Sequence, residues 1–316
     1  MRLGLLSTAN INRMLLAAVP DGVEIASVAS RDGAKAQAYA HEHGIPSSHG
    51  SYEALLEDDG IDAVYISLPN LMHHEWTLKA IDADKHVLVE KPYSRRAADV
   101  EEAWDAAEKA GVVVMEAFMY RHQPQAAKAQ ELVRSGAIGR LRSIRAVFGF
   151  RLDDLENIRA LPELEGGALM DVGCYCVSGS RLLGGEPERV YGEQVVGSTG
   201  VDMDFHGLLR FPDDVVASFD ASFTVPGQQQ RLEAVGDEGR LVVEAPWRVD
   251  WGGRLLVNDE PVAVEQPDSY ELELANFAAA VEGRAQPLLG REDALQQARV
   301  IEALYRSADT AEAVTL

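Results

Sequence analysis

A lysine at the end of a buried strand is the first residue whose position suggests chemistry. The apolar run His86–Val89 is followed by Glu90, Lys91 and Pro92. A lysine in a partly desolvated cleft has its pKa lowered, so Lys91 can exchange protons or polarise a hydroxyl or carbonyl group. The alternative is a surface ion pair between Glu90 and Lys91.

A second candidate lies in the segment E-G-G-A-L-M-D-V-G-C-Y-C, which contains Asp171 and Tyr175. If residues 171–180 are helical, the two side chains are four residues apart and share one face. Reached by Lys91, they would form a proton relay in which Tyr175 gives or takes the proton of an alcohol and Lys91 lowers the pKa of the tyrosine. The alternative is a core tyrosine whose hydroxyl bonds Asp171.

The first apolar run, Leu3–Leu6, ends where a dinucleotide site would carry the glycines of G-x-G-x-x-G. Ser7, Ala9 and Asn12 occupy those three places. The first two are small, and a serine hydroxyl can bond phosphate, but Asn12 is less expected where a helix packs closely. Alone, the turn leaves a cofactor site and a plain strand–turn–helix both open. The candidate phosphate contacts are Ser7, Thr8, Ala9, Asn10 and Ile11.

The ends of the next strands add to the cofactor hypothesis. Ser30 and Arg31 follow the second strand, a little over twenty residues after Ser7. An acid there binds the ribose of NAD, whereas an arginine suits the 2′-phosphate of NADP. Arg31 therefore predicts NADP, Asp32 leaves NAD as the alternative, and a solvated loop arginine is the third interpretation. The further candidate cofactor contacts are Leu68, Pro69, Asn70 (also a candidate helix cap), His73, Glu90 and Lys91.

These residues need a scaffold, and residues 1–121 supply one by alternating strand-like and helix-like segments. The predicted strands are Leu3–Leu6, Glu24–Ala29, Ala63–Ser67, His86–Val89 and Val112–Glu116. The predicted helices include Ala34–His43, Tyr52–Leu56, His74–Ala83 and Ala97–Ala110. This alternation predicts a parallel, doubly wound sheet covered on both faces, as in α/β dinucleotide-binding (Rossmann) domains.

Residues 122–316 show a different pattern, in which strands follow one another with few helices between them. This predicts an α+β domain with a large, open, mostly antiparallel sheet. The predicted strands are Leu141–Phe150, Arg189–Val196, Asp204–Phe211, Val215–Phe223, Arg231–Gly236 and Gly239–Ala245. The predicted helices are Pro124–Ser135, Tyr270–Glu282 and Arg291–Ala308. We expect the last helix to pack back on the first domain.

Composition excludes several classes of function. The formal net charge of −22 argues against nucleic acid or an anionic membrane as partner. No apolar run is long enough to cross a membrane, and no signal peptide precedes the first strand, so we expect a cytoplasmic protein. Cys174 and Cys176 have no matching Cys/His cluster, so we interpret them as structural thiols and predict no metal site.

Three motifs in this order resemble the glucose–fructose oxidoreductase / inositol dehydrogenase / MocA (Gfo/Idh/MocA) family: S-L-P-N-x-x-H, E-K-P and G-G-A-L-M-D-V-G-x-Y. The resemblance implies hydride transfer between a nicotinamide and a carbinol carbon of a sugar or cyclic polyol. It matches Lys91 to the lysine that bonds the reacting hydroxyl and Asp171 to the acidic residue of the last motif. Tyr175 favours the branch of xylose dehydrogenase, dihydrodiol dehydrogenase and glucose–fructose oxidoreductase.

With this resemblance, we interpret the opening turn as a cofactor site with substituted glycines. The expected function is that of an NADP-dependent aldose 1-dehydrogenase of the xylose or glucose type. The alternatives are a sugar-nucleotide ketoreductase and a non-catalytic NADP-binding regulator. An open sheet face predicts a homodimer or homotetramer. The candidate substrate contacts are Lys91, Tyr93, Arg121, His122, Asp171 and Tyr175.

Overall fold

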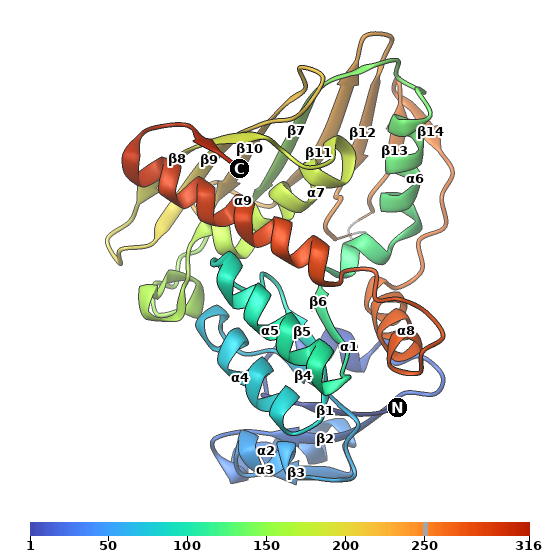
Figure 1. The fold of residues 1–316 in the computed structure, drawn as a ribbon, viewed down its shortest axis with the longest axis vertical. Helices are drawn as coiled ribbons and strands as arrows, with labels where there is room; N and C mark the ends of the chain where they lie inside the picture. Colours follow the sequence, from blue (N-terminus) through green and yellow to red (C-terminus); the bar gives the residue numbers. More distant parts are fainter. Residues whose placement is uncertain (249–251) are drawn as a thin grey trace. The chain divides into compact units, whose positions relative to one another are not determined.

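The computed structural model describes residues 1–248 and 252–316, which divide into two units (Figure 1). Unit 1 contains Met1–Met119 and Pro267–Leu295, and unit 2 contains Tyr120–Gln266 and Gln296–Leu316. The sequence had assigned residues 267–295 to the second domain. They join unit 1 because α8 (Ser269–Val281) packs against α1 (Asn12–Leu16). α9 (Arg291–Thr310) begins in unit 1 and continues in unit 2.

Unit 1 is built on the predicted parallel sheet, in the order β3-β2-β1-β4-β5-β6. Its strands are β1 (Arg2–Leu5), β2 (Glu24–Ala29), β3 (Ser47–His49), β4 (Ala63–Ile66), β5 (His86–Glu90) and β6 (Val114–Ala117). All five pairings are parallel. The order reverses direction between β1 and β4, and ligands of such sheets bind at the carboxyl ends of the strands at that point.

The helices of unit 1 agree with the predicted segments, and α1 is the helix of the expected strand–turn–helix, for which the sequence alone gives no bounds. The others are α2 (Gly33–His43), α3 (Tyr52–Leu56), α4 (Asn70–Asp82), α5 (Ala97–Ala110) and α8. Figure 1 shows α4 and α5 side by side, and α4 packs on β5. α4 begins four residues earlier than predicted, so the predicted cap is wrong: Pro69 occupies the cap position and Asn70 is the first helical residue. Pro69 is extended, with ψ 153°, so the helix cannot begin before it.

Unit 2 contains the predicted open sheet, in the order β14-β13-β12-β11-β7-β10-β9-β8-β15. Its strands are β7 (Leu141–Gly149), β8 (Arg189–Val196), β9 (Asp202–Arg210), β10 (Val216–Ser222), β11 (Gln229–Gly236), β12 (Arg240–Glu244), β13 (Leu255–Val257), β14 (Glu260–Val262) and β15 (Val314–Thr315). Of its pairings, β7 with β10 is parallel and the others are antiparallel.

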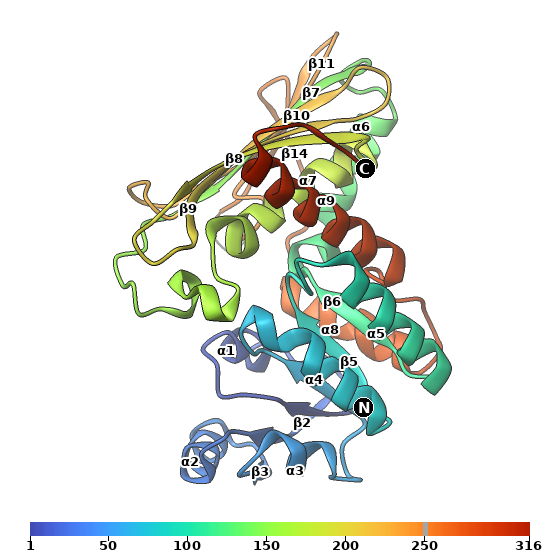
Figure 2. The same cartoon turned by 60° about the vertical axis from the view of Figure 1, so that its left-hand side comes forward.

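The helices of unit 2 are α6 (Pro124–Arg134), α7 (Cys174–Gly184) and most of α9. α7 packs on β7, β10 and β11, and α6 packs on α7. Figure 2 shows α6, α7 and α9 on the same face of the nine-stranded sheet. A π-helical turn, Leu169–Gly173, runs directly into α7. The region predicted as helix from Asp171 is therefore helical, with a wider first turn.

Two of the sequence expectations concern absences. Within residues 1–248 and 252–316, no helix is both long and apolar enough to span a bilayer. Across the same residues, no three His, Cys, Asp or Glu side chains are grouped as metal ligands would be. Cys174 and Cys176 are buried free thiols. The cytoplasmic location and the absence of a metal stay predictions.

Candidate active site

The turn after β1 is held by a buried hydrogen-bond network across the point where the sheet order reverses. The Ser67 hydroxyl donates to Asn12 Oδ1 at 2.6 Å, and Asn12 Nδ2 donates to the Ser7 carbonyl at 2.8 Å. The Ser7 hydroxyl lies 2.7 Å from the Ser67 hydroxyl and donates to the Ser67 carbonyl at 3.2 Å. Ser7 Oγ also accepts from the Ala9 amide at 3.0 Å.

This network explains how the turn forms without the glycine fingerprint. Ser7 and Asn12 are buried, whereas Thr8, Ala9, Asn10 and Ile11 between them are partly or fully exposed. The ends of the turn are thus fixed while its middle stays accessible at the carboxyl end of β1. That arrangement fits the pyrophosphate of a dinucleotide.

The end of β2 carries the residues that are predicted to distinguish NADP from NAD. Asp32 caps α2, because its Oδ1 accepts from the amides of Ala34 at 2.9 Å and Lys35 at 3.2 Å. Ser30 is buried, and its hydroxyl accepts from the Asp32 amide at 3.2 Å. Arg31 is exposed and hydrogen-bonds Tyr52, where its charge partly offsets the burial that raises the pKa of that tyrosine. The acid is therefore occupied within its own helix, and the arginine is accessible.

His73 joins the loops that follow β4 and β5. Its Nδ1 lies 3.0 Å from the Pro92 carbonyl oxygen and its Nε2 lies 2.8 Å from the Leu68 carbonyl oxygen. Burial lowers the pKa of His73 to about 4, so the ring is neutral near pH 7 and donates one of these two bonds. A ring that is 1% exposed acts on a ligand mainly through the loops that it joins, and its direct contact with cofactor stays a prediction.

Lys91 follows Glu90 at the end of β5 and is only partly exposed. The Lys91–Pro92 peptide bond is cis. The Tyr65 hydroxyl donates to Glu90 Oε1, and the Lys91 amide donates to Glu90 Oε2 at 3.3 Å. Tyr65 and Glu90 lie on the same face of the sheet. Tyr65 pairs with Leu88 on β5, and Glu90, two residues further along β5, points to the same side as Leu88. The glutamate thus ties the backbone of Lys91 to the neighbouring strand.

Sequence reasoning missed a second carboxyl group in this cluster. Glu273 of α8 is 1% exposed, and its Oε1 has no hydrogen-bond partner among the described residues. Burial raises the pKa of Glu273 well above its ordinary value, and the charge of Glu90 raises it further. The sequence pattern that could have identified Glu273 is an acidic residue on the apolar face of a predicted helix. Glu273 lies three residues after Tyr270 and one before Leu274, and both are buried.

Tyr93 is buried beneath α4 and α5. Its hydroxyl is 2.9 Å from His74 Nδ1, and its ring meets Trp104 edge to face. The Tyr93 amide donates to Glu116 Oε1 at 2.7 Å. These contacts make Tyr93 a packing residue of unit 1, and its contact with substrate stays a prediction.

In unit 2, the two glycines before the π-helical turn meet different neighbours. A Cβ on Gly166 would lie 2.4 Å from the Arg159 carbonyl oxygen, so the chain approaches closely there. Gly167 has φ +126°, and its Cβ would lie 2.1 Å from Asp202 Oδ1. Asp202 in turn accepts from the Leu169 amide at 2.7 Å, which fixes the start of the turn. π-helical turns are often found at functional sites.

Asp171 lies within the π-helical turn and is paired with a residue that sequence reasoning missed. Arg159 Nε donates to Asp171 Oδ2 at 2.7 Å. An adjacent guanidinium favours the ionised form of a carboxylate. Asp171 therefore has a cationic partner, Arg159, from the preceding loop, in addition to its predicted neighbour Tyr175. No spacing rule places an arginine twelve residues earlier beside it.

Tyr175 lies among aromatic rings. The ring centroids of Tyr120, Phe148 and Trp247 are 5.9, 5.4 and 5.9 Å from that of Tyr175. The Tyr120 hydroxyl is 2.7 Å from Ser178 Oγ, one turn along α7. These rings restrict the orientation of the tyrosine and lower the polarity around it.

Arg121 and His122 lie on the 3-10 turn Met119–His122. Arg121 donates to Ser178 Oγ at 3.4 Å, which brings it to the helix that carries Tyr175. Burial, with the charge of Arg121, lowers the pKa of His122 to about 4. Its Nε2 is buried without a hydrogen-bond partner in the described part of the chain.

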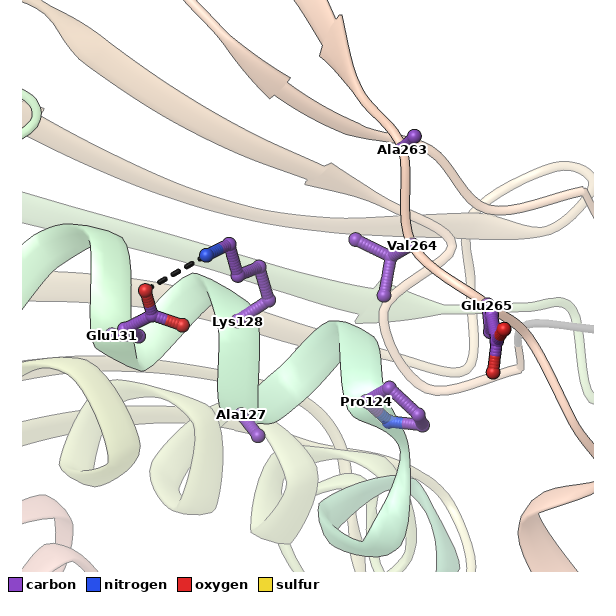
Figure 3. Close-up of a pocket in the computed structure, with 7 residues that line it drawn as sticks. All are labelled: Pro124, Ala127, Lys128, Glu131, Ala263, Val264 and Glu265. Carbon is purple, nitrogen blue, oxygen red and sulfur yellow. Dashed lines mark hydrogen bonds and ion pairs between the residues drawn. The ribbon is translucent and has the colours of Figure 1, made fainter.

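A surface pocket of about 390 Å³ lies away from these residues, between α6 and the segment after β14 (Figure 3). The Lys128 ammonium and Glu131 pair at 2.8 Å on one wall. The pocket is lined by Pro124, Ala127, Lys128, Glu131, Ala263, Val264 and Glu265. It contains none of the predicted site residues.

Comparisons with known proteins cover both units. Residues 4–118 match an oxidoreductase family described as having an NAD-binding Rossmann fold, and residues 126–242 match the GFO/IDH/MocA C-terminal domain. The chain is 41% identical to a D-xylose 1-dehydrogenase (NADP⁺) of Haloferax volcanii over the whole length of both.

Two solved structures are similar over nearly the whole chain. An aldose–aldose oxidoreductase from Caulobacter crescentus, complexed with glycerol, has a TM-score of 0.92 at 27% identity and covers 100% of this chain and 99% of that one. A 3-ketoreductase from Actinomadura kijaniata, in complex with NADP and TDP-benzene, has a TM-score of 0.89 at 28% identity and covers 97% of each chain.

Proposed function

Because the chain belongs to the Gfo/Idh/MocA family of oxidoreductases, we propose that it is an NADP-dependent aldose 1-dehydrogenase. The observation that carries the proposal is the full-length similarity to an NADP⁺-dependent D-xylose dehydrogenase. The exposed Arg31 and the helix-capping Asp32 support NADP over NAD.

The proposed reaction oxidises the C1 hydroxyl of a cyclic aldose to a lactone. Tyr175 takes the hydroxyl proton as general base, while the positive charge of Lys91 favours the phenolate and holds the hydroxyl oxygen. Bound NADP⁺ supplies the acceptor for the C1 hydride. Asp171 and His122 accept hydrogen bonds from other hydroxyls of the sugar.

A sugar-nucleotide ketoreductase is the second candidate, supported by the likeness to the 3-ketoreductase bound to TDP-benzene. The charge of unit 2 near Asp171 argues against it. Residues 151–165 carry five acidic and two basic residues. Both arginines are paired with carboxylates at 2.7 Å, Arg151 with Asp153 and Arg159 with Asp171. Such a loop is poorly suited to a nucleoside diphosphate.

Steady-state assays distinguish the candidates. NADP⁺ and NAD⁺ are tested separately with D-xylose, D-glucose, inositols and cyclic diols, following absorbance of the reduced cofactor. We expect turnover with NADP⁺ and an aldose, without inhibition by free TDP. Turnover that requires a sugar nucleotide, with competition by TDP, would transfer the assignment to the ketoreductase.

We also propose that the enzyme is a homodimer or homotetramer. Val195, Val196 and Leu208 on β8 and β9 are each about half exposed, and in Figure 2 none of the helices of the described residues covers the face of the sheet opposite α7. Burial of such a face in a second copy is the usual solution. Light scattering at micromolar concentration tests this, and a monomer would contradict it.

A further inference from the structure

The loop between β7 and the π-helical turn, residues 151–165, is built around Arg159. Its 3-10 turn Ile158–Ala160 is capped by Asn157, whose Oδ1 accepts from the Arg159 amide at 3.1 Å. The same oxygen lies 3.4 Å from Arg159 Nη1. The guanidinium is therefore held at two points, by Asn157 at Nη1 and by Asp171 at Nε. Arg159 is thus ordered before any substrate binds.

The backbone of this loop docks on the two glycines. The Gly167 amide donates to the Arg159 carbonyl at 2.8 Å, and the Gly166 amide donates to the Leu161 carbonyl at 3.0 Å. The Asp171 amide then donates to the Gly167 carbonyl at 3.0 Å. Arg159 contacts the Gly166–Asp171 segment through both its main chain and its side chain. The loop and the π-helical turn are therefore held together.

The exposed fractions of the Arg159 and Asp171 side chains indicate that the arginine supports the carboxylate. The Arg159 side chain is 41% exposed and the Asp171 side chain 16% exposed. The arginine thus covers a carboxylate that keeps limited access to solvent. A carboxylate held ionised by a guanidinium accepts hydrogen bonds, and it is a poor proton donor at neutral pH.

We propose that Arg159 is a positioning residue that orients Asp171 as an acceptor for a substrate hydroxyl, so that Asp171 takes no part in proton transfer. This inference rests on the proposed function and assigns a part to a loop residue outside the family motifs of the sequence. It also limits the substrate at this position to a neutral hydroxyl, because the cation there is already paired.

A double-mutant cycle tests the proposal in the full-length enzyme. Arg159→Leu, Asp171→Asn and the double variant are compared for kcat and KM with the preferred aldose, and for NADP⁺ affinity. Loss of a charge-assisted hydrogen bond predicts a fall in kcat/KM of about tenfold to a hundredfold for Arg159→Leu. The fall should lie mainly in KM, NADP⁺ affinity should stay within about threefold, and Arg159→Lys should recover part of the loss.

The double variant decides whether Arg159 acts through Asp171. If it does, the double variant loses little more than Asp171→Asn alone, because the partner of the arginine is already altered. Losses that multiply would overturn the proposal, as would normal kinetics in Arg159→Leu. The matched control is Arg151→Leu, in the same loop, whose side chain forms an exposed pair with Asp153 and which should keep wild-type kinetics.

Hydrogen exchange separates this proposal from the proposed function. The backbone amides of residues 159 and 167 should exchange faster in Arg159→Leu than in wild type. In Arg151→Leu both amides should exchange at the wild-type rate. If wild type oxidises no aldose, the proposed function fails, and the exchange data still decide whether Arg159 orders the turn. Unchanged exchange in Arg159→Leu would contradict the positioning role whatever the substrate.

Discussion

The Ser67 hydroxyl donates a 2.6 Å hydrogen bond to Asn12 Oδ1, which links the end of β4 to the start of α1 across the reversal of the sheet order. A glycine at position 12 would allow close packing but could not accept this bond. Polar side chains thus hold the turn where other dinucleotide-binding folds use glycines. The same bond makes the turn sensitive to loss of a single amide group.

Asn12→Ala should lower the free energy of unfolding by about 1–3 kcal/mol, because the Ser67 hydroxyl and the Ser7 carbonyl lose buried partners. NADP⁺ affinity should fall with it. Urea unfolding and fluorescence titration measure the two effects. Asn10→Ala, an exposed change in the same turn, is the control for stability. Equal stability of wild type and Asn12→Ala would show that the network is dispensable.

Glu273 should make stability depend on pH. Its pKa is raised in the folded state, so above its ordinary value of 4.5 the unfolded chain releases this proton while the folded chain keeps it. Glu273→Gln should therefore gain about 1.4 kcal/mol relative to wild type for each pH unit above that value, until the raised pKa is reached.

Urea unfolding of both proteins between pH 5 and pH 8 measures this slope. Glu271→Gln, the same change at an exposed position of the same helix, is the matched control. A stability difference between Glu273→Gln and wild type that is independent of pH would mean that Glu273 is ionised in the folded protein.

Arg31→Ala should weaken NADP⁺ binding about tenfold to a hundredfold and leave NAD⁺ binding nearly unchanged, because only NADP⁺ presents a 2′-phosphate to the guanidinium. Calorimetric titration of both cofactors measures the difference. Arg13→Ala on α1, whose exposed side chain lies 3.7 Å from Glu42, is the control. Equal weakening of the two cofactors would remove Arg31 from the phosphate site.

Lys91→Ala should reduce kcat by about a hundredfold to ten-thousandfold, the usual contribution of a group that assists proton transfer, while NADP⁺ binding is retained. Stopped-flow turnover and equilibrium titration separate the two effects. Lys128→Ala, paired with Glu131 on α6, should be fully active. Turnover near wild type in Lys91→Ala would refute its assignment.

Sequence patterns predicted the fold where period and length were clear. The strands from Glu24 and Arg189 have the predicted bounds, because long apolar or alternating runs leave little choice. The three-residue edge strand Ser47–His49 was missed, because it is too short to show a period. The return of residues 267–295 to unit 1 has no local signal at all.

The candidate site divides in the same way. Lys91, Asp171 and Tyr175 were proposed from motif and spacing, which the sequence displays directly. Arg159 and Glu273 were not, because each acquires its place through tertiary contact: an ion pair across a loop, and burial of α8 beside Glu90. Such partners depend on the folded chain and on no fixed separation in sequence.

Transfer of the substrate hydrogen is the most direct test of the central claim. Wild-type enzyme is incubated with NADP⁺ and D-xylose deuterated at C1, and the nicotinamide product is analysed by mass spectrometry and proton NMR. The account predicts deuterium at C4 of the reduced nicotinamide, together with the lactone. A reduced cofactor without deuterium, or no reduction with any deuterated aldose, would contradict an aldose 1-dehydrogenase.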